Sequence, residues 1–297
     1  MSPYLPEGVT PELYPFTGKF LEIKDGIKLH YLDEGSGKPV VMVHGNPTWS
    51  FYYRNLASAL KLNNRVIVPD HIGCGLSDKP GDDKYDYTLK SRADDLEQLL
   101  ETIGVKEKIT LVLHDWGGMI GMTYAVRHPE RIEKIVLMNT GAFFLPEDKA
   151  FPPAMWLART FLGTVLVRGF NAFAAVSARV CCKRRPMSPE LRRAYTAPYN
   201  NWANRIATLR FVQDVPVKPA DKAYAVVKDT QEKLPQFAGL PILIFWGMKD
   251  FIFDQHFLKV WRGLYPRAET HIYPDCGHYV LEDAGEEMIP LIKKFIA

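Results

Sequence analysis

The sequence has few cysteines and no long apolar run. Its 297 residues include four cysteines, and their spacing matches neither a zinc site nor a disulfide framework. No stretch of about 18 residues is apolar without a charge, which argues against a membrane-spanning helix. Internal repeats and low-complexity tracts are missing as well. These shortages exclude a disulfide scaffold, a zinc protein, an integral membrane protein and a repeat array.

Targeting and nucleotide-binding signals are also lacking. Residues Met1 to Phe16 are rich in proline and have neither the basic start nor the apolar core of a signal peptide. The turn from Gly35 to Pro39 does not have the spacing of a phosphate-binding loop. No histidine spacing suits a metal site, and the four cysteines fit a reducing cytoplasm. We therefore expect a cytoplasmic protein that binds no nucleic acid and needs no metal and no other cofactor.

What is present is the composition of a soluble globular protein, 47% hydrophobic and 24% charged. The net charge of +3 conceals an asymmetry. Residues 151–217 contain ten Lys and Arg residues against two acids, Glu190 and Asp214, and the rest of the chain is net negative. Such a segment could face an anionic partner, a membrane surface or an acidic protein. The alternative is that scattered arginines only solvate helix faces.

Short apolar segments alternate with helical patterns along most of the chain. Two alternating segments flank Asp25-Gly26 and predict a β-hairpin. Continuous apolar runs are typical of buried parallel strands. We expect strands at Phe20–Ile23, Ile27–Leu32, Val40–Val43, Arg65–Val68, Ile109–Leu113, Ile132–Met138, Ile242–Trp246 and Glu269–Tyr273, and helices at Leu89–Ile103, Gln255–Leu264 and Gly285–Phe295. This alternation predicts an α/β fold with a mostly parallel, doubly wound sheet.

The pattern changes between Phe144 and Pro216. This region contains no apolar run of the buried-strand type, and its apolar residues recur at helical spacing. Pro186, Pro189 and Pro198 separate the helical pieces. We therefore expect an α/β core of residues 1–144 and 216–297 and an inserted helical cap of residues 145–215.

The segment from Ile109 to Gly121 has the pattern of a nucleophile elbow, in which a strand turns sharply into a helix. Asp115 occupies the tip, where serine is common, and Gly117-Gly118 follow it. A carboxylate at that tip can attack an electrophilic carbon and form an ester with the substrate. The alternative is that Asp115 only caps the following helix.

Two further residues follow predicted strands in the order that this architecture requires. Asp250 comes after the strand that ends at Trp246, and His278 comes after the last strand. The carboxyl ends of parallel strands meet at one edge of a sheet, so we expect an Asp115-His278-Asp250 triad. Taken singly, His278 could be an ordinary loop histidine, and Asp250 could be a helix cap with Asp254 in its place.

The residues around the elbow can supply hydrogen-bond donors. The backbone N–H groups of Asn46 and of Trp116 are candidates for an oxyanion hole, in which one donor is worth about 3 kcal/mol. Other polar residues at strand ends are expected to be structural: Asp70 in a turn, and His44, His71 and His114 bonded to loop backbone.

An aspartate nucleophile points to chemistry at an sp³ carbon. The core resembles the haloalkane dehalogenase and epoxide hydrolase group of the α/β-hydrolases. The resemblance lies in four segments: His44-Gly45-Asn46-Pro47, His114-Asp115-Trp116-Gly117-Gly118, Gly247-Met248-Lys249-Asp250 and Gly277-His278. It implies that Trp116 and Asn46 donate hydrogen bonds to a leaving group. Epoxide hydrolases use cap tyrosines instead, and the cap side of this chain offers Tyr195, Tyr199 and Tyr224.

Outside the shared core, the chain resembles the β-lactone decarboxylases of bacterial long-chain olefin biosynthesis. The segments that carry this resemblance are Asn139–Phe143, Phe170–Phe173, Arg193–Trp202, Asn204–Ile206 and Gly277–Asp283. It implies decarboxylation of a cis-β-lactone with two alkyl chains to a cis-alkene and carbon dioxide. It also implies assembly with other olefin-biosynthesis enzymes, while the basic cap surface would alternatively suit a peripheral membrane contact.

Three functions therefore compete. The first is a β-lactone decarboxylase, and the second is a haloalkane dehalogenase with the same triad and with halide held by Trp116 and Asn46. The third is a non-catalytic binding protein on a hydrolase scaffold, because a fold does not determine a function. The residues do not decide whether Asp115 would attack the ring sp³ carbon or the carbonyl of a lactone.

Overall fold

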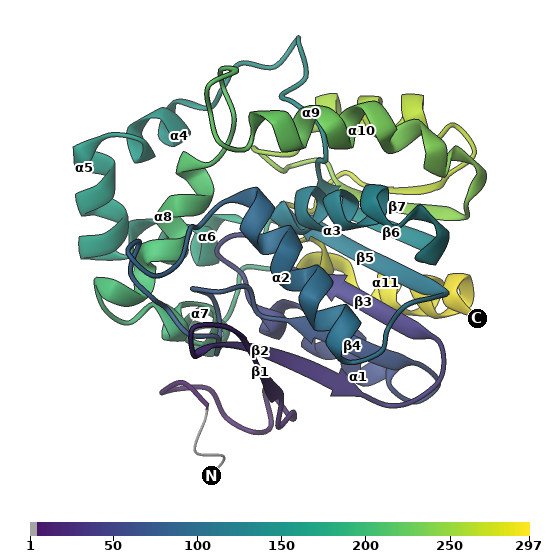
Figure 1. Cartoon of the computed structure of the whole chain (residues 1–297), viewed down its shortest axis with the longest axis horizontal. Coiled ribbons are helices and arrows are strands. Elements are labelled where there is room, and N and C mark those ends of the chain that lie inside the picture. Colours follow the sequence, from purple (N-terminus) through teal and green to yellow (C-terminus); the bar gives the residue numbers. More distant parts are fainter. Residues whose placement is uncertain (1–4) are drawn as a thin grey trace.

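The computed structural model describes residues 5–297, and the first four residues of the proline-rich N-terminal segment lie outside the described part. An eight-stranded sheet forms the centre, in the order β1-β2-β4-β3-β5-β6-β7-β8 (Figure 1). Both pairs that involve β2 are antiparallel, and the other pairs are parallel. The strands are β1 Lys19–Lys24, β2 Ile27–Glu34, β3 Pro39–Val43, β4 Arg65–Pro69, β5 Ile109–Asp115, β6 Ile132–Thr140, β7 Ile242–Gly247 and β8 Glu269–Tyr273.

Strand β5 lies in the middle of the sheet and carries the predicted elbow. Its Leu113 pairs with Val43 of β3 on one side and with Leu137 of β6 on the other. All seven residues of β5 are buried, because helices cover both faces of the sheet at this position. The loops that follow β3, β5, β7 and β8 therefore meet at the same edge.

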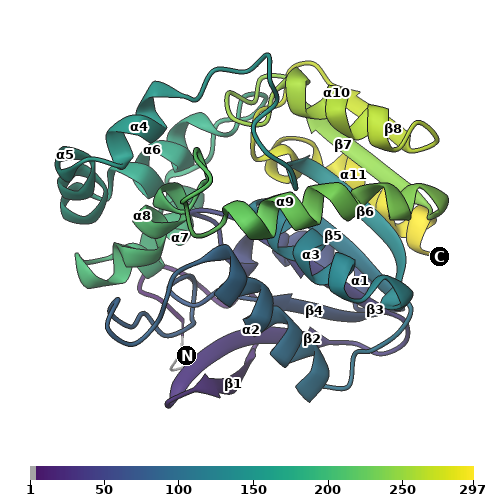
Figure 2. The same cartoon turned by 45° about the horizontal axis from the view of Figure 1, so that its top comes forward.

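Two hydrophobic clusters fill the space between the sheet and its helices. Helices α2, α3, α9 and α10 contribute to the cluster on one face, and Figure 2 shows α2, α3 and α9 packed side by side over the sheet. Helices α1 and α11 contribute to the cluster on the opposite face. The bounds are α1 Arg54–Leu60, α2 Leu89–Thr102, α3 Trp116–Arg127, α9 Tyr224–Lys233, α10 Gln255–Leu264 and α11 Val280–Ile296.

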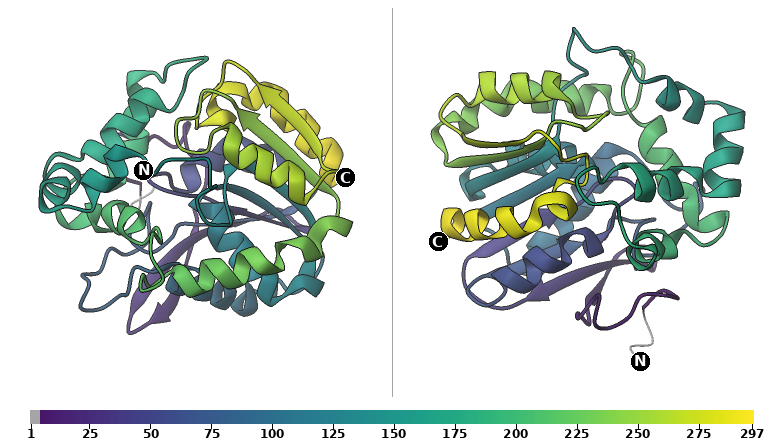
Figure 3. Two further views of the ribbon diagram at one scale, coloured as in Figure 1. Left: turned by 90° about the horizontal axis from the view of Figure 1, so that it is seen from above. Right: turned by 180° about the vertical axis from the view of Figure 1, so that it is seen from behind.

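Between β6 and α9 the described chain forms helices and loops without a strand. These helices gather on one side of the molecule, beyond the carboxyl ends of the strands (Figures 1 and 3), and we call them the cap. They are α4 Pro153–Ala158, α5 Phe161–Thr164, the π-helical turn η3 Val165–Gly169, α6 Ala172–Val180, α7 Pro189–Thr196, η4 Ala197–Tyr199, η5 Ala203–Arg205 and α8 Ile206–Gln213. The limits 145 and 215 stay a prediction, since the helices mark only where regular structure begins and ends.

The expected α/β architecture is confirmed, and each expected strand lies within one or two residues of its observed position. The last helix differs, because α11 begins at Val280 and not at Gly285. Ala284 has non-helical angles (φ −130°, ψ 19°) and kinks the helix just before the expected start. The short helix α1 and the helix α9 were not expected.

Candidate active site

The turn from β5 into α3 holds Asp115 in a conformation that is rare for a residue with a side chain. Its φ is +52° and its ψ is −128°, a region that normally needs glycine. The turn is also tightly packed, since a Cβ on Gly117 would collide with the carbonyl of Val43. The Asp115 side chain makes no capping bond to α3. The alternative of a simple helix cap is therefore wrong.

The structure brings the three predicted triad residues together. His278 Nε2 lies 3.4 Å from Asp115 Oδ2, and His278 Nδ1 lies 2.7 Å from Asp250 Oδ2. All three side chains are buried. The other oxygen of Asp250 accepts bonds from the N–H groups of Ile252 (2.7 Å) and Phe253 (3.1 Å). The carboxylate of Asp250 is therefore fixed by its own loop, and it fixes the imidazole.

The His278 imidazole is buried between the carboxylates of Asp115 and Asp250, and this position favours its protonated form. Burial acts to raise the pKa of Asp115, but its contacts with His278 and with the Asn46 N–H outweigh this and lower it. Burial acts to lower the pKa of His278, yet Asp250 and Asp115 outweigh this and raise it to about 10. At neutral pH the resting site thus holds a charged Asp115 and a protonated His278. Any reaction that needs His278 as a base must first remove the charge of Asp115.

His114 supports the loop that carries His278. Its Nε2–H donates to the carbonyl oxygen of His278 at 2.8 Å, as expected for a histidine bonded to loop backbone. Its ring lies 4.3 Å from that of Tyr52 and 4.7 Å from that of His278. Burial lowers the pKa of His114 to about 3, so this ring stays neutral and adds no positive charge to the site.

Asn46 approaches the nucleophile from the loop after β3. Its backbone N–H donates to Asp115 Oδ1 at 2.6 Å, and its side-chain Nδ2 donates to the Thr208 carbonyl of α8 at 3.0 Å. This approach requires Gly45, because a Cβ there would overlap the Asp115 carboxylate. The expected backbone donor is thus in place, and the amide links the site to the cap.

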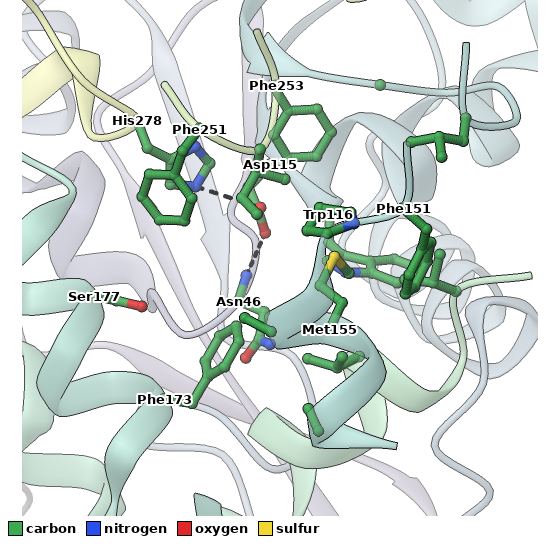
Figure 4. A pocket seen from close by; sticks show the side chains of 18 of the residues that line it. Asn46, Asp115, Trp116, Phe151, Met155, Phe173, Ser177, Phe251, Phe253 and His278 are labelled. Carbon is green, nitrogen blue, oxygen red and sulfur yellow. Dashed lines mark hydrogen bonds and ion pairs between the residues drawn. The ribbon is translucent and has the colours of Figure 1, made fainter. Parts of the chain in front are cut away.

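Trp116 lies on the opposite side of Asp115 from His278 (Figure 4). Its side chain lines the pocket and its ring lies 5.3 Å from that of Phe211 in α8. Within residues 5–297, no residue accepts a hydrogen bond from its indole N–H. The indole N–H and the second N–H of the Asn46 side-chain amide, whose first N–H is bonded to Thr208, are therefore the donors that a substrate anion beside Asp115 would meet.

The loop after β3 is held by the histidines and the aspartate that were expected to be structural. His44 Nδ1 donates to its neighbour's carbonyl at Gly45 (2.8 Å), and His71 Nε2 donates to the His44 carbonyl (2.9 Å). Asp70 accepts from the N–H groups of Ser50 (2.6 Å) and Leu76 (2.9 Å). These residues shape the loop and do not line the pocket.

Asp254, the competitor for the role of Asp250, has another place. It caps α10 through the His256 N–H and forms an ion pair with Lys149 at 2.6 Å. Tyr195 and Tyr199 bond to Glu282 and to the Thr48 carbonyl, and Tyr224 packs against Phe144. None of the three tyrosines lines the pocket. The cap-tyrosine chemistry of epoxide hydrolases therefore has no support here.

A cavity of about 420 Å³ lies between the core and the cap. Asp115, His278, Asn46 and Trp116 form its polar end, and Figure 4 shows their side chains around one point. Most of the wall is apolar and comes from the cap and from the loops after β6 and β7, with Phe151, Met155, Leu166, Phe173, Phe251 and Phe253 among the lining residues. Such a site suits an alkyl substrate with one polar, reactive group.

Sequence patterns did not identify Lys149 and Ser177, two polar residues of the cavity wall. Lys149 lies in a loop without a motif, and Ser177 is one polar residue in an apolar helix. Their placement depends on how the cap packs onto the core. No local signal in the sequence could have found them.

Comparison with known proteins agrees with this geometry. The family model of the alpha/beta hydrolase fold matches residues 38–285. The chain therefore belongs to the alpha/beta hydrolase family, in the group that includes cis-3-alkyl-4-alkyloxetan-2-one decarboxylases and haloalkane dehalogenases. A cis-3-alkyl-4-alkyloxetan-2-one decarboxylase of Shewanella oneidensis is 62% identical over 96% of this chain and 89% of its own.

Other relatives are more distant. The decarboxylase of the same name from Xanthomonas campestris is 47% identical, over 95% of this chain and 97% of its own. A haloalkane dehalogenase of Mycolicibacterium paratuberculosis is 32% identical over 93% of this chain and 91% of its own. Among solved structures, the haloalkane dehalogenase DatA from Agrobacterium tumefaciens superposes with a TM-score of 0.83, at 23% identity and over 97% and 99% of the two chains. The last likeness concerns the fold alone.

Proposed function

We propose that this protein decarboxylates cis-3,4-dialkyl-β-lactones to cis-alkenes and carbon dioxide, with Asp115 as the nucleophile. The observation that carries this proposal is a charged carboxylate on a strained elbow at the end of an apolar cavity. The decarboxylases that are 62% and 47% identical to the chain supply the substrate class. The substrate is thus a small hydrophobic molecule.

In the first step, a carboxylate oxygen of Asp115 attacks the ring carbon that bears the lactone oxygen. The bond between that carbon and the ring oxygen breaks, the carbon is inverted, and a substrate carboxylate is released. The Trp116 indole N–H and the Asn46 amide are the groups we assign to this carboxylate, because both lie at the polar end of the cavity. Charge-assisted bonds of this kind are the stronger ones.

In the second step, the bond from the substrate to its carboxylate breaks and carbon dioxide leaves. The electron pair forms the double bond and expels Asp115, whose carboxylate is restored without water, oxidant or reductant. The apolar wall favours this step, because a carboxylate that loses its charge gains from a site with little water. Inversion followed by anti elimination is a net syn loss, so the cis geometry of the lactone is retained.

His278 and Asp250 have an electrostatic role in this scheme. The protonated His278 holds Asp115 in place through the contact of 3.4 Å and stabilises its charge when it departs. Asp250 orients the imidazole through Nδ1. The decarboxylation route needs no base, which agrees with a His278 whose pKa is raised to about 10.

Haloalkane dehalogenation is the second candidate, and the Trp116 and Asn46 donors favour it. The alkyl-Asp115 ester would then be hydrolysed by a water that His278 activates. This becomes chemically reasonable once Asp115 is esterified, because the lost charge lowers the pKa of His278. A non-catalytic binding role does not explain the strained elbow at Asp115 or the buried triad.

Further assignments are part of the same proposal. We assign residues 145–215 to a cap that encloses the substrate, and the basic surface of the cap to contacts with other olefin-biosynthesis enzymes or with a membrane. A cytoplasmic location fits the four cysteines, which are all buried free thiols.

The test is to supply synthetic cis- and trans-dialkyl β-lactones and to identify the products by gas chromatography. We expect a cis-alkene from the cis-lactone. A β-hydroxy acid as the sole product would identify a lactone hydrolase. Fast halide release from haloalkanes without lactone turnover would identify a dehalogenase.

A further inference from the structure

Large apolar side chains are exposed on the outer surface of the cap. We define the cap patch by five of them: Trp156, Phe161, Leu162, Phe170 and Trp202. Phe161 is 85% exposed and Phe170 is 74% exposed. None of the five lines the cavity, so substrate binding does not account for them. An apolar surface of this kind usually marks a contact with another molecule.

The helices below the patch lie along the surface of the cap. By length and composition, no single helix among residues 5–297 could cross a membrane, and the segments Phe161–Gly169 and Ala172–Val180 pass that test only as a pair bent by 71°. Asn171 lies at the bend in a left-handed conformation (φ +54°), which asparagine tolerates well. Phe170 precedes the bend, and each segment carries one arginine, Arg168 or Arg179. This arrangement fits a pair of helices that lies on a membrane surface.

Cations beside the patch lack acidic partners. Arg179, Arg192 and Arg193 line a groove of about 310 Å³ between α6 and α7, and Asn171, the residue after Phe170, lines it too. None of these three arginines forms an ion pair within the described part of the chain. Arg184 and Arg210, also in the cap region, do pair with carboxylates. The groove is therefore suited to anions from outside the chain.

Two residues of the cavity wall are also exposed on the surface of the cap. Leu157 and Val176 are both exposed and both line the cavity, and they belong to α4 and α6. Leu157 is the neighbour of Trp156 in the patch. A molecule that left the cavity between these helices would arrive beside the cap patch.

We propose that the cap patch and the arginine groove bind an anionic lipid bilayer, so that the cavity opens toward the lipid. Aromatic side chains with nearby arginines are the pattern of a peripheral membrane contact. A second copy of the chain fits poorly, because residues 151–217 hold ten cations and two acids and two such surfaces repel each other. The proposal rests on the proposed function only for its purpose, which is to exchange water-insoluble alkyl substrates and alkenes with the membrane.

The experiment measures binding of the full chain, without substrate, to vesicles of phosphatidylcholine with and without phosphatidylglycerol. We expect binding only with the anionic lipid, and weaker binding at high salt. Removing three cations with Arg179→Gln, Arg192→Gln and Arg193→Gln should reduce the vesicle affinity by up to about 100-fold. The matched control is Arg262→Gln, Lys293→Gln and Lys294→Gln on α10 and α11, which should leave the affinity nearly unchanged.

The apolar part is tested by Phe161→Ser with Phe170→Ser, which should lower the affinity about tenfold or more. The matched control is the double variant Leu62→Ser and Ile272→Ser. It changes two apolar residues that are exposed on the α/β part of the molecule, outside the cap. Equal binding to neutral vesicles, equal losses in the controls, or self-association without vesicle binding would each overturn the proposal.

Turnover of a short, water-soluble cis-lactone separates this proposal from the proposed function. All cap-patch and groove variants should retain it, since none of the changed residues lines the cavity. Failure of the wild-type protein to turn over the lactone, together with intact vesicle binding, would remove the proposed function and leave the membrane contact standing. Normal lactone turnover without vesicle binding would support the proposed function and refute the membrane contact.

Discussion

The substitution Asp250→Asn distinguishes the two chemical routes open to this site. In the wild type, the Asp250 Oδ2 accepts a hydrogen bond of 2.7 Å from His278 Nδ1, and the Asp250 Oδ1 accepts hydrogen bonds from two loop N–H groups. Asparagine can keep the two loop bonds through its own oxygen, but it presents an N–H to His278. The variant therefore keeps the loop conformation. It loses the negative charge that orients the imidazole and favours its protonated form.

The expected loss depends on whether His278 acts as a base. A hydrogen bond to a charged group is worth about 1.5–3 kcal/mol, which corresponds to about 10- to 100-fold in rate. We expect a loss of this size in lactone decarboxylation, where His278 acts only through its charge. Where a histidine must act as a base in the correct tautomer, the same change costs about ten-thousandfold.

The assay is the single-turnover rate of alkene formation, together with the intact mass of the enzyme and its thermal unfolding. Asp254→Asn is the matched control. Asparagine caps a helix about as well as aspartate, so this variant should keep the cap of α10 and lose only the ion pair with Lys149. It should therefore cost little stability and little activity. An unimpaired Asp250→Asn enzyme, or a loss near ten-thousandfold with an ester on Asp115, would refute the reasoning.

Three further predictions concern the same residues. Asp115→Ala should abolish turnover and leave a folded protein with an unchanged circular dichroism spectrum, and wild-type rates from it would remove Asp115 from the mechanism. Trp116→Phe keeps the ring and loses the N–H, so kcat should fall by about 10- to 100-fold, whereas an unchanged kcat would leave Asn46 as the sole side-chain donor. Because the pKa of Asp115 is lowered and that of His278 is raised to about 10, kcat/KM for the lactone should be level between about pH 6 and 9. A rise centred near the ordinary histidine pKa of about 6.5 would instead show that the reaction needs neutral His278.

The same pKa shift has a consequence for stability. The folded-state pKa of His278 is raised above its unfolded value, so its contribution to stability is fully present below about pH 6.5. That contribution is lost as the pH rises through about 10. As the pH is raised toward 10, the urea concentration at the midpoint of unfolding should therefore decrease more for the wild type than for His278→Gln.

The core of the fold was predictable because its signals are local. A buried parallel strand has to be apolar throughout, as Val40–Val43 and Ile109–Leu113 are. The elbow is recognisable in the sequence from Asp115 and from Gly117-Gly118. A glycine is needed at 117 because no side chain fits where this residue approaches the Val43 carbonyl. The chain order of Asp115, Asp250 and His278 then follows from the topology.

The cap and the electrostatics of the site were not predictable in this way. Which faces of α4 and α6 line the cavity depends on the packing of the cap on the core, which no periodicity specifies. The kink at Ala284, which moves the start of α11, depends on tertiary contacts as well. The protonation of His278 arises from the distances to two carboxylates, and these appear only in three dimensions.

The central claim is that Asp115 displaces the lactone oxygen and is itself expelled when carbon dioxide leaves. The most direct measurement is repeated turnover of a cis-dialkyl β-lactone in water labelled with heavy oxygen, followed by mass spectrometry of the peptide that contains Asp115. The account predicts a cis-alkene and an Asp115 carboxylate without label, because water never attacks the ester. Label in Asp115, with a β-hydroxy acid as the product, would contradict it.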